Sequence, residues 1–189
     1  MMASNTITIG NYSRGLKNYF GDLTICTDDD HTLEHCLQEY CSDSHTARKY
    51  RLAGLRAVLS EHLYEDRLNY IVEKVFGVNL KPQLPMIAMV ARCDNESQVA
   101  HAIKAYQRQN YLHKKLYILG HQTVNDTDDI INLTQEEAEN MSASLEGIDF
   151  YACLCGDDYY GPNYLTDLAL TCRYGAYSGI GKAMYYDFD

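Results

Sequence analysis

The residues best suited to chemistry stand together near the C-terminal end of the sequence, in the run Leu154-Cys155-Gly156-Asp157-Asp158-Tyr159. We call this run the acidic turn. Its two carboxylates follow an apolar segment, and ionised groups beside a core are costly unless they are paired or bind a metal. Hard oxygen ligands suit Mg²⁺ or Mn²⁺, and such a cation would bridge the diphosphate of a bound nucleotide. The acidic turn therefore predicts a metal site with Asp157 and Asp158 as ligands.

A simpler interpretation of the acidic turn is that it only precedes a helix. Gly161 and Pro162 follow it. Proline is favoured in the first turn of a helix, and acidic side chains stabilise a helix N-terminus. In that case Asp157 and Asp158 would cap the next helix and bind nothing. The residues alone leave both interpretations open.

Alternating strand and helix patterns would position the acidic turn. Apolar residues at helical spacing predict helices around Leu33–Tyr40, Leu52–Leu59, Leu68–Val75, Val99–Tyr106 and Leu165–Cys172, with a further helix near Gln135–Ser144. Strands are expected at Thr6–Ile9, Leu23–Thr27, Met86–Ala91, Lys115–Leu119 and Phe150–Cys155. This order predicts an α/β fold with largely parallel pairing. Because ligands bind at the carboxyl ends of parallel strands, the polar turn at Arg92–Ser97 is a second candidate binding segment.

A break in the pattern at Val78–Pro85 predicts two domains. Pro82 and Pro85 lie here beside Gly77 and Asn79, and proline ends helices and biases the residue before it to extended geometry. We therefore expect an N-terminal domain over residues 1–77, a linker over 78–85 and a C-terminal domain over 86–189.

Charge and composition limit the partners. The formal net charge is −10, of which residues 1–85 contribute −2 (9 bases, 11 acids) and residues 86–189 contribute −8 (7 bases, 15 acids). Such an acidic surface repels a phosphate backbone, so we expect no nucleic acid partner. The seven cysteines lack zinc-ribbon spacing and are expected to be reduced thiols. No secretory signal and no membrane-spanning run is visible, so a cytoplasmic location is expected.

The C-terminal part resembles a known family. Residues 85–111, 116–120 and 150–165 are similar to the first strand–helix–strand and the D-x-D region of family 2 glycosyltransferases. The resemblance implies a GT-A fold, a nucleotide-diphosphate sugar as donor, a glycan acceptor and a divalent metal. It places Asp157 on the second acid of D-x-D, Asp158 on the acid that follows, and Ala91 and Arg92 on the turn that meets the nucleotide. The first acid of the motif is replaced by Cys155.

The N-terminal part resembles a second family. Residues 11–22 and 60–67, the latter reading Ser-Glu-His-Leu-Tyr-Glu-Asp-Arg, are similar to the C-terminal end of CgeB-like, group-1-type glycosyltransferases, which have a GT-B fold. The family resemblance implies a piece made of a strand and closing helices. Both resemblances are partial, so we expect the chain to span the junction of a tandem glycosyltransferase.

Two functional hypotheses follow from these patterns. In the first, the chain is a metal-dependent glycosyltransferase, or the donor-binding portion of one. In the second, it is a non-catalytic binding or assembly module that keeps the fold, because no residue after Asp158 matches the catalytic base of such enzymes. A nucleotidyl- or phosphotransferase using the same acids is a third, weaker alternative. A partial sheet would expose a strand edge, which predicts self-association.

Overall fold

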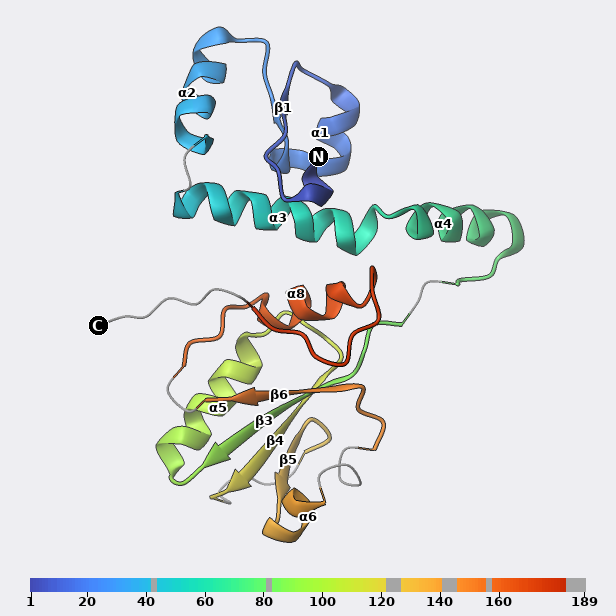
Figure 1. Ribbon diagram of the computed structural model, residues 1–189. Coiled ribbons are helices and arrows are strands. Elements are labelled where there is room, and N and C mark those ends of the chain that lie inside the picture. The colour runs from blue at the N-terminus through green and yellow to red at the C-terminus, as the bar shows by residue number, and fades with distance from the viewer. Residues whose placement is uncertain (42–43, 81–82, 122–126, 141–145, 156–157, 183–189) are drawn as a thin grey trace. The chain divides into compact units, whose positions relative to one another are not determined.

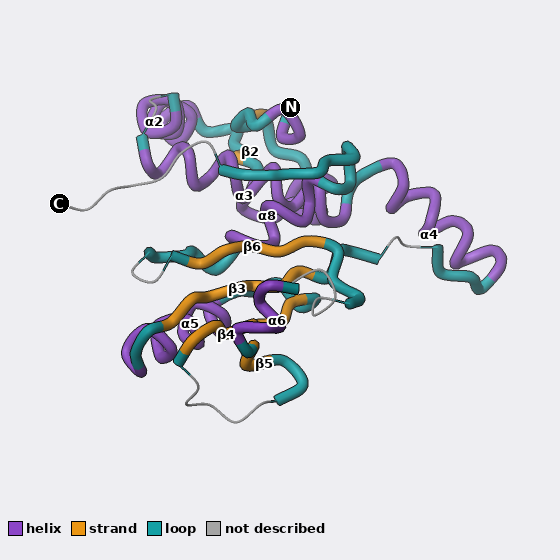
Figure 2. Tube along the Cα trace, turned by 60° about the horizontal axis from the view of Figure 1, so that its bottom comes forward, coloured by secondary structure: helices purple, strands orange, loops and turns teal. Residues whose placement is uncertain are grey.

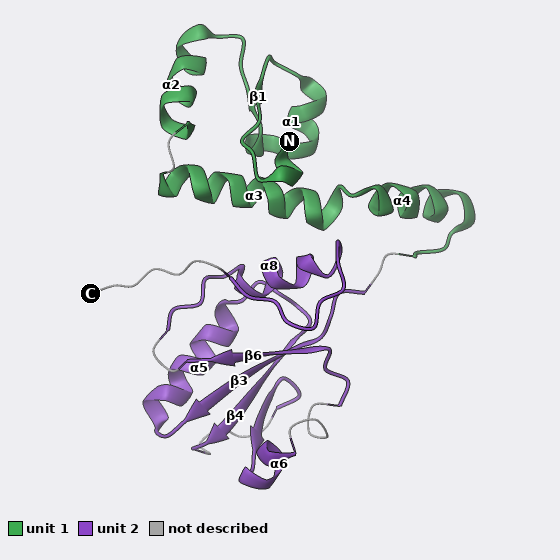
Figure 3. Cartoon of the chain, in the orientation of Figure 1, with its two compact units in different colours: residues 1–82 green, residues 83–189 purple. Residues whose placement is uncertain are grey.

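The computed structural model describes all residues except 42–43, 81–82, 122–126, 141–145, 156–157 and 183–189. It divides into two compact units, Met1–Pro82 and Gln83–Asp189 (Figure 3). Both units combine helices with parallel strands, so the predicted α/β architecture is confirmed. Within the described ranges, no helix is both long and apolar enough to cross a membrane.

The N-terminal unit is mainly helical. Strands β1 (Ile9–Gly10) and β2 (Ile25–Cys26) pair in parallel, and they are shorter than the predicted Thr6–Ile9 and Leu23–Thr27. The short 3-10 turns η1 and η2 span Met2–Ser4 and Gly21–Leu23. The helices in the described part of this unit are α1 (Arg14–Phe20), α2 (Asp30–Tyr40), α3 (His45–Glu61) and α4 (Tyr64–Phe76) (Figure 1).

Local sequence explains where these helices begin and end. The side chains of Ser13, Asp29 and Ser44 accept hydrogen bonds from backbone N–H groups in the first turns of α1, α2 and α3. Helix α4 ends at Gly77, whose φ of 69° is the left-handed conformation that glycine adopts readily. The core of the unit is small: Ala47 of α3 is fully buried, and Met2 packs against Gly54 of the same helix. No residue of α4 is buried.

The C-terminal unit is built on a four-stranded parallel sheet with the order β5-β4-β3-β6. Its strands are β3 (Ile87–Cys93), β4 (Lys114–Gly120), β5 (Ile130–Leu133) and β6 (Phe150–Leu154), and its helices are α5 (Glu96–Arg108), α6 (Gln135–Glu139) and α8 (Tyr164–Thr171). Figure 2 shows the strands side by side with α5 and α8 outside them. Strands β3, β4 and β6 begin and end within two residues of the predictions, whereas β5 was not predicted.

The main core lies on one face of this sheet. Met89, Leu116 and Ile118 point from β3 and β4 toward Val99 of α5 and Leu165 of α8, and all five side chains are nearly or fully buried. A smaller cluster on the opposite face contains Ala88, Val90, Tyr117 and Leu133. Since β3 is buried on both faces, its continuous apolar sequence follows from its central place in a parallel sheet.

Candidate functional site

The sheet of the C-terminal unit contains a point where the strand order reverses. From β3 the chain proceeds to β4 and β5 on one side and then returns to β6 on the other, with all pairs parallel. Open α/β sheets bind ligands at this point, beyond the carboxyl ends of the strands. A small cleft lies there, which we call the switch-point cleft. It is lined by Ala91, Arg92, Cys93, Gln98, His101, Ala102, Ala105, Leu154, Cys155 and Tyr160.

The two residues that the sequence places on the nucleotide-binding turn both line this cleft. Ala91 is buried in β3 between Ile118 of β4 and Leu154 of β6. Arg92 is exposed, and its Nε atom lies 3.9 Å from Oδ1 of Asp94. An exposed ion pair of this length contributes little stability. The guanidinium of Arg92 is therefore free to exchange Asp94 for an anionic ligand.

The turn after β3 is fixed by two hydrogen bonds that involve Gln98. Oδ1 of Asn95 accepts from the N–H of Gln98 at 3.0 Å, which caps α5. Oε1 of Gln98 in turn accepts from the N–H of Asp94 at 2.7 Å. Because Asp94 precedes the N-cap residue Asn95, the Gln98 side chain holds the chain that follows Arg92 against the first turn of α5.

The carboxyl ends of β3 and β4 approach each other closely. The N–H of His121 donates to the carbonyl oxygen of Cys93 at 2.7 Å. Gly120 has a φ of 101°, and a Cβ atom at this position would lie 2.5 Å from the same oxygen. The Cys93 side chain is buried, and burial, followed by the nearby Asp94 carboxylate, raises the pKa of its thiol. Cys93 therefore forms a neutral wall of the cleft.

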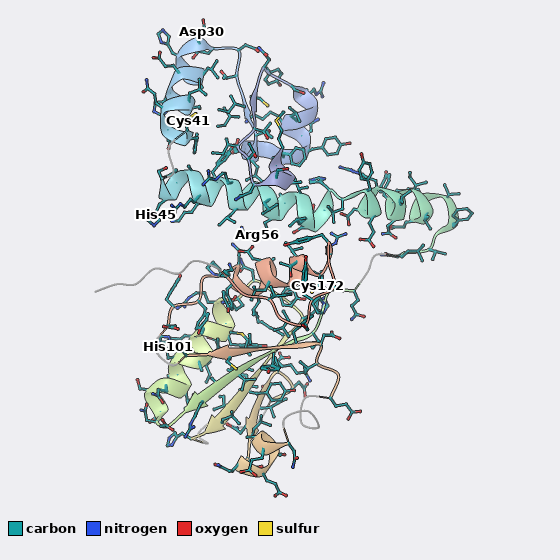
Figure 4. The ribbon with its side chains drawn as sticks, in the orientation of Figure 1. Asp30, Cys41, His45, Arg56, His101 and Cys172 are labelled. Atoms are coloured by element: carbon teal, nitrogen blue, oxygen red, sulfur yellow. The ribbon has the colours of Figure 1, made fainter. Side chains whose placement is uncertain are left out.

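The acidic turn is only partly described. Asp157, with Gly156, lies outside the described residues. Asp158 is exposed, and its N–H donates to the carbonyl oxygen of Cys155 at 3.3 Å. Its own carbonyl oxygen lies 3.2 Å from Nε2 of His101 on α5, and it accepts a hydrogen bond when that nitrogen carries the proton. Figure 4 labels His101 on this helix.

The helix-capping interpretation of Asp158 is wrong. Helix α8 begins at Tyr164, and Asn163 occupies its N-cap position. Asp158 lies five residues before that cap, and its backbone turns toward α5. Pro162 also precedes the helix, so it does not occupy the first helical turn as expected. Helix capping therefore does not explain why an acid stands at position 158.

The segment after the acidic turn is anchored to the C-terminal half of α5. The guanidinium of Arg108 stacks over the Tyr159 ring at 4.3 Å and donates to the carbonyl oxygen of Tyr160 at 3.4 Å. The Tyr160 hydroxyl accepts from the N–H of Cys155 at 2.9 Å, and burial raises the pKa of Tyr160 to about 12. Tyr160 thus lines the cleft while its contacts link Cys155 at the end of β6 to Arg108 of α5.

Two further residues complete this anchor. Nε2 of Gln109, a buried polar side chain, donates to the carbonyl oxygen of Gly161 at 3.0 Å, and its Oε1 accepts from the N–H of Leu165 at 3.2 Å. The N–H of Asn110 donates to the carbonyl oxygen of Pro162 at 2.8 Å. Buried amides that are fully hydrogen-bonded hold a loop in one conformation.

The described residues do not form a complete metal site. Of the described part of the chain, no group of three His, Cys, Asp or Glu side chains could hold an ion. At the acidic turn the described donors are the Asp158 carboxylate and the Cys155 thiol, and a thiol is a poor ligand for Mg²⁺ or Mn²⁺. The predicted metal site therefore depends on Asp157 and stays a prediction.

Sequence reasoning missed His101, Gln98 and Tyr160, which also line the cleft. They come from a helix and a loop, and they are brought to the strand ends only by folding. One signal was present for His101: it immediately precedes Ala102 in the apolar stripe of α5, the helix that follows β3.

In the N-terminal unit, the predicted family motif forms a small cluster at the junction of α3 and α4. Nη2 of Arg67 lies 2.9 Å from Nδ1 of His62, and the guanidinium stacks over the Tyr19 ring at 5.2 Å. The His62 ring also meets Phe20 edge-on, at a centroid distance of 4.7 Å. These contacts give His62 a packing role between α1 and the two later helices.

Comparison with protein families gives one match. Residues 1–73 match a family described as Glycosyl transferase-like. The match covers the N-terminal unit almost to the end of α4, and it agrees with a general resemblance of this part to glycosyltransferases. It does not extend to the acidic turn. No curated protein and no solved structure matches the chain.

Proposed function

We propose that this chain is a glycosyltransferase, or the donor-binding portion of one, and that its C-terminal unit binds a nucleotide-diphosphate sugar in the switch-point cleft. The observation that carries the proposal is the position of the cleft at the strand-order reversal between β3 and β6. The glycosyl transferase-like match of residues 1–73 gives independent support for glycosyl transfer as the general activity.

The groups around the cleft suit a diphosphate. Arg92 is exposed at the mouth with only a weak partner in Asp94. Arginine binds phosphate oxygens through two parallel N–H donors, which fixes orientation as well as charge. His101 also lines the cleft, and its imidazole contacts the carbonyl oxygen of Asp158 in the acidic turn. Ala91 and Leu154 are almost completely buried, so a nucleobase or ribose would contact the exposed groups around the cleft rather than these two side chains.

Metal dependence is the finer part of the proposal. Asp157 and Asp158 would contribute carboxylate ligands, and Cys155 in place of the first acid would leave the site weaker than a complete D-x-D motif. A bound divalent cation would neutralise the diphosphate and act as a Lewis acid on the leaving phosphate. Residues 86–189 carry a net charge of −8, which repels an anionic donor. A bound cation would reduce this repulsion.

The domain assignment completes the proposal. Residues 86–189 would be the donor-binding half of a GT-A, family 2 domain, and residues 1–77 would be the end of a CgeB-like GT-B domain, joined by the linker at 78–85. The acceptor would be a glycan. The alternative is a non-catalytic binding or assembly module, which is favoured because no residue after Asp158 matches a catalytic base, whereas the pair Asp157 and Asp158 favours the transferase.

Calorimetric titration tests the proposal. Uridine, guanosine and thymidine diphosphates are titrated into the full chain with and without Mn²⁺, and the titrations are repeated on Arg92→Ala and Asp157→Asn. Asp128→Asn is the matched control, because Asp128 is an exposed acid beside β5 and away from the cleft. We expect the wild-type chain to bind one of these nucleotides. The Arg92→Ala variant should bind it about tenfold or more weakly, and in Asp157→Asn the affinity should no longer depend on Mn²⁺. The Asp128→Asn control should bind it as the wild type does.

Each outcome has a distinct meaning. The absence of nucleotide binding under every condition would contradict the donor site. Binding that does not respond to Mn²⁺ would retain the cleft and reject the metal. Incubation with the matching nucleotide sugars then separates the two functions, because a transferase releases nucleoside diphosphate in the presence of an acceptor glycan and a binding module does not.

A further inference from the structure

One face of helix α5 borders the switch-point cleft. Gln98, His101, Ala105 and Arg108 follow one another at intervals of three and four residues, so their side chains lie on the same side of the helix. The first three of them line the cleft. Ala105 is buried, whereas Gln98 and His101 are half-buried. These two polar side chains are therefore the part of α5 that can bind the turns around the cleft.

The Gln98 side chain holds the turn after β3. Its Oε1 atom accepts a hydrogen bond of 2.7 Å from the N–H of Asp94. Asp94 is the ion-pair partner of Arg92, the exposed arginine at the mouth of the cleft. Gln98 thus fixes the backbone directly beyond β3, beside the cation that we propose for the diphosphate.

The His101 side chain holds the acidic turn. Its Nε2 atom lies 3.2 Å from the carbonyl oxygen of Asp158, and because a carbonyl oxygen only accepts, the two form a hydrogen bond when Nε2 carries the proton. Arg108, about two helical turns further along, stacks over the Tyr159 ring at 4.3 Å but does not line the cleft. Of these two contacts with α5, the one made by His101 therefore holds the acidic turn at the cleft.

The sheet itself does not hold these two turns together. The ladder between β3 and β6 ends at the pair Ala91 and Leu154. The residues that leave the two strands, Arg92–Asp94 and Cys155–Asp158, lie beyond this last pair. Since Gln98 and His101 are three residues apart on one helix, α5 bridges the two turns where the ladder has ended.

We propose that Gln98 and His101 are positioning residues that together set the distance between the turn after β3 and the acidic turn, and so the width of the donor site. This inference rests on the proposed function of the cleft. A ligand between the two turns meets Arg92 on one and the acidic turn on the other. Groups that bind a ligand must be held within about 0.5 Å of their productive positions by supporting contacts. The spacing of Gln98 and His101 along α5 supplies that support.

Four variants of the full chain test the proposal, together with one control. Gln98→Leu and His101→Leu each remove one hydrogen bond to a turn, and the double variant removes both. His101→Gln is the conservative variant, because the glutamine amide keeps an N–H donor for the Asp158 carbonyl oxygen. The control is Gln107→Leu, a substitution on the exposed side of the same helix. Urea unfolding verifies that each variant is folded.

Hydrogen exchange without any ligand measures the hold on the turns. Gln98→Leu should speed exchange at the amide of Asp94, which loses its acceptor. His101→Leu should speed exchange at the amides of Cys155 and Asp158, whose hydrogen bonds lie within the turn that it releases. His101→Gln and the control should exchange as the wild type does.

Calorimetric titration then measures the effect on the donor site, with uridine, guanosine and thymidine diphosphates as probes. Each leucine variant should bind the nucleotide that the wild type binds about fivefold more weakly, and His101→Gln should restore most of the loss. The double variant should lose little more than either single variant, because the distance between the turns is already unset once one of them is released. The control should bind as the wild type does.

The outcomes separate this inference from the proposed function. Unchanged exchange in both turns would overturn the inference, since the strands alone would then hold them. Faster exchange with unchanged nucleotide affinity would overturn it as well, and would leave the donor site standing. A wild-type chain that binds none of the three nucleotides would instead contradict the proposed function, and the role of Gln98 and His101 in donor binding would be rejected with it.

Discussion

The buried side-chain amide of Gln109 donates a hydrogen bond of 3.0 Å to the carbonyl oxygen of Gly161, and so ties the end of α5 to the segment after the acidic turn. Through Oε1 it also accepts from the first turn of α8. One side chain therefore positions three elements that converge beside the switch-point cleft.

Gln109→Leu should destabilise the C-terminal unit. The substitution keeps the volume but leaves the Gly161 carbonyl and the Leu165 N–H without their partner in a buried site, which costs about 1–3 kcal/mol. Urea unfolding of the full chain measures the change. The control is Gln107→Leu on the exposed side of the same helix, which should change the free energy of unfolding by less than about 0.5 kcal/mol. Equal effects of the two substitutions would show that the anchor is unimportant.

Gly120→Ala should distort the junction of β3 and β4. The added Cβ atom would lie 2.5 Å from the backbone oxygen of Cys93, and the φ of 101° is unfavourable for alanine. We expect a loss of about 1–3 kcal/mol. Thermal unfolding of the full chain measures the change, and Gly179→Ala, at a position with no atom within 4 Å of the added Cβ, should be nearly neutral. If Gly120→Ala left the melting temperature unchanged, the ends of β3 and β4 would have to be able to move apart.

Alkaline pH should destabilise the C-terminal unit through Tyr160. Burial raises its pKa from 10.0 to about 12, because the neutral phenol is favoured in the folded state. A raised pKa contributes stability that is complete below about pH 10 and is lost as the pH rises toward 12. The difference in phenolate absorbance between the wild-type chain and Tyr160→Phe should therefore show a midpoint near pH 12. A midpoint near the ordinary value of 10.0 would contradict the burial of this ring.

Arg67→Ala should loosen the junction of α1, α3 and α4. It removes the contact with His62 Nδ1 and the stacking on Tyr19, and a partly exposed cation–π contact is worth about 0.5–1 kcal/mol. Hydrogen exchange followed by mass spectrometry should show faster exchange in α1 and at the start of α4. Arg14→Ala, an exposed arginine in the first turn of α1, is the control and should leave the His62 cluster protected. Unchanged exchange in Arg67→Ala would show that this cluster does not hold the junction.

The strands that could be predicted are those with a distinctive local pattern. Met86–Ala91 and Phe150–Cys155 are continuous apolar runs, because each strand contributes to a parallel sheet covered by helices. Strand β5 has only four residues between the acids at 128–129 and Thr134, so its apolar content is too short to stand out. Helix α3 begins at His45, seven residues before the predicted stripe, since a stripe identifies a buried face and not a boundary.

Of the candidate site, only the residues that directly follow a predicted strand could be predicted from the sequence. Ala91 and Arg92 follow from the rule that ligands meet the ends of parallel strands, and both line the cleft. The contact of His101 with Asp158 joins residues 57 positions apart, and no local pattern encodes the packing of α5 that creates it. Gln109 reads in the sequence as an ordinary helix-terminal polar residue, and its value as an anchor comes entirely from burial.

The contrast between the thiols in and around β3 and β6 gives the chain built-in chemical probes. Cys93 is buried and its thiolate is disfavoured, so it should resist alkylating reagents, whereas Cys153 and Cys155 are exposed and should be modified first. Labelling followed by peptide mapping can then report on two surfaces at once. Protection of Cys155 by a nucleotide would register occupancy of the cleft, and protection of Cys153 on concentrating the protein would register a covered sheet edge, with Cys93 as the internal standard of an intact fold.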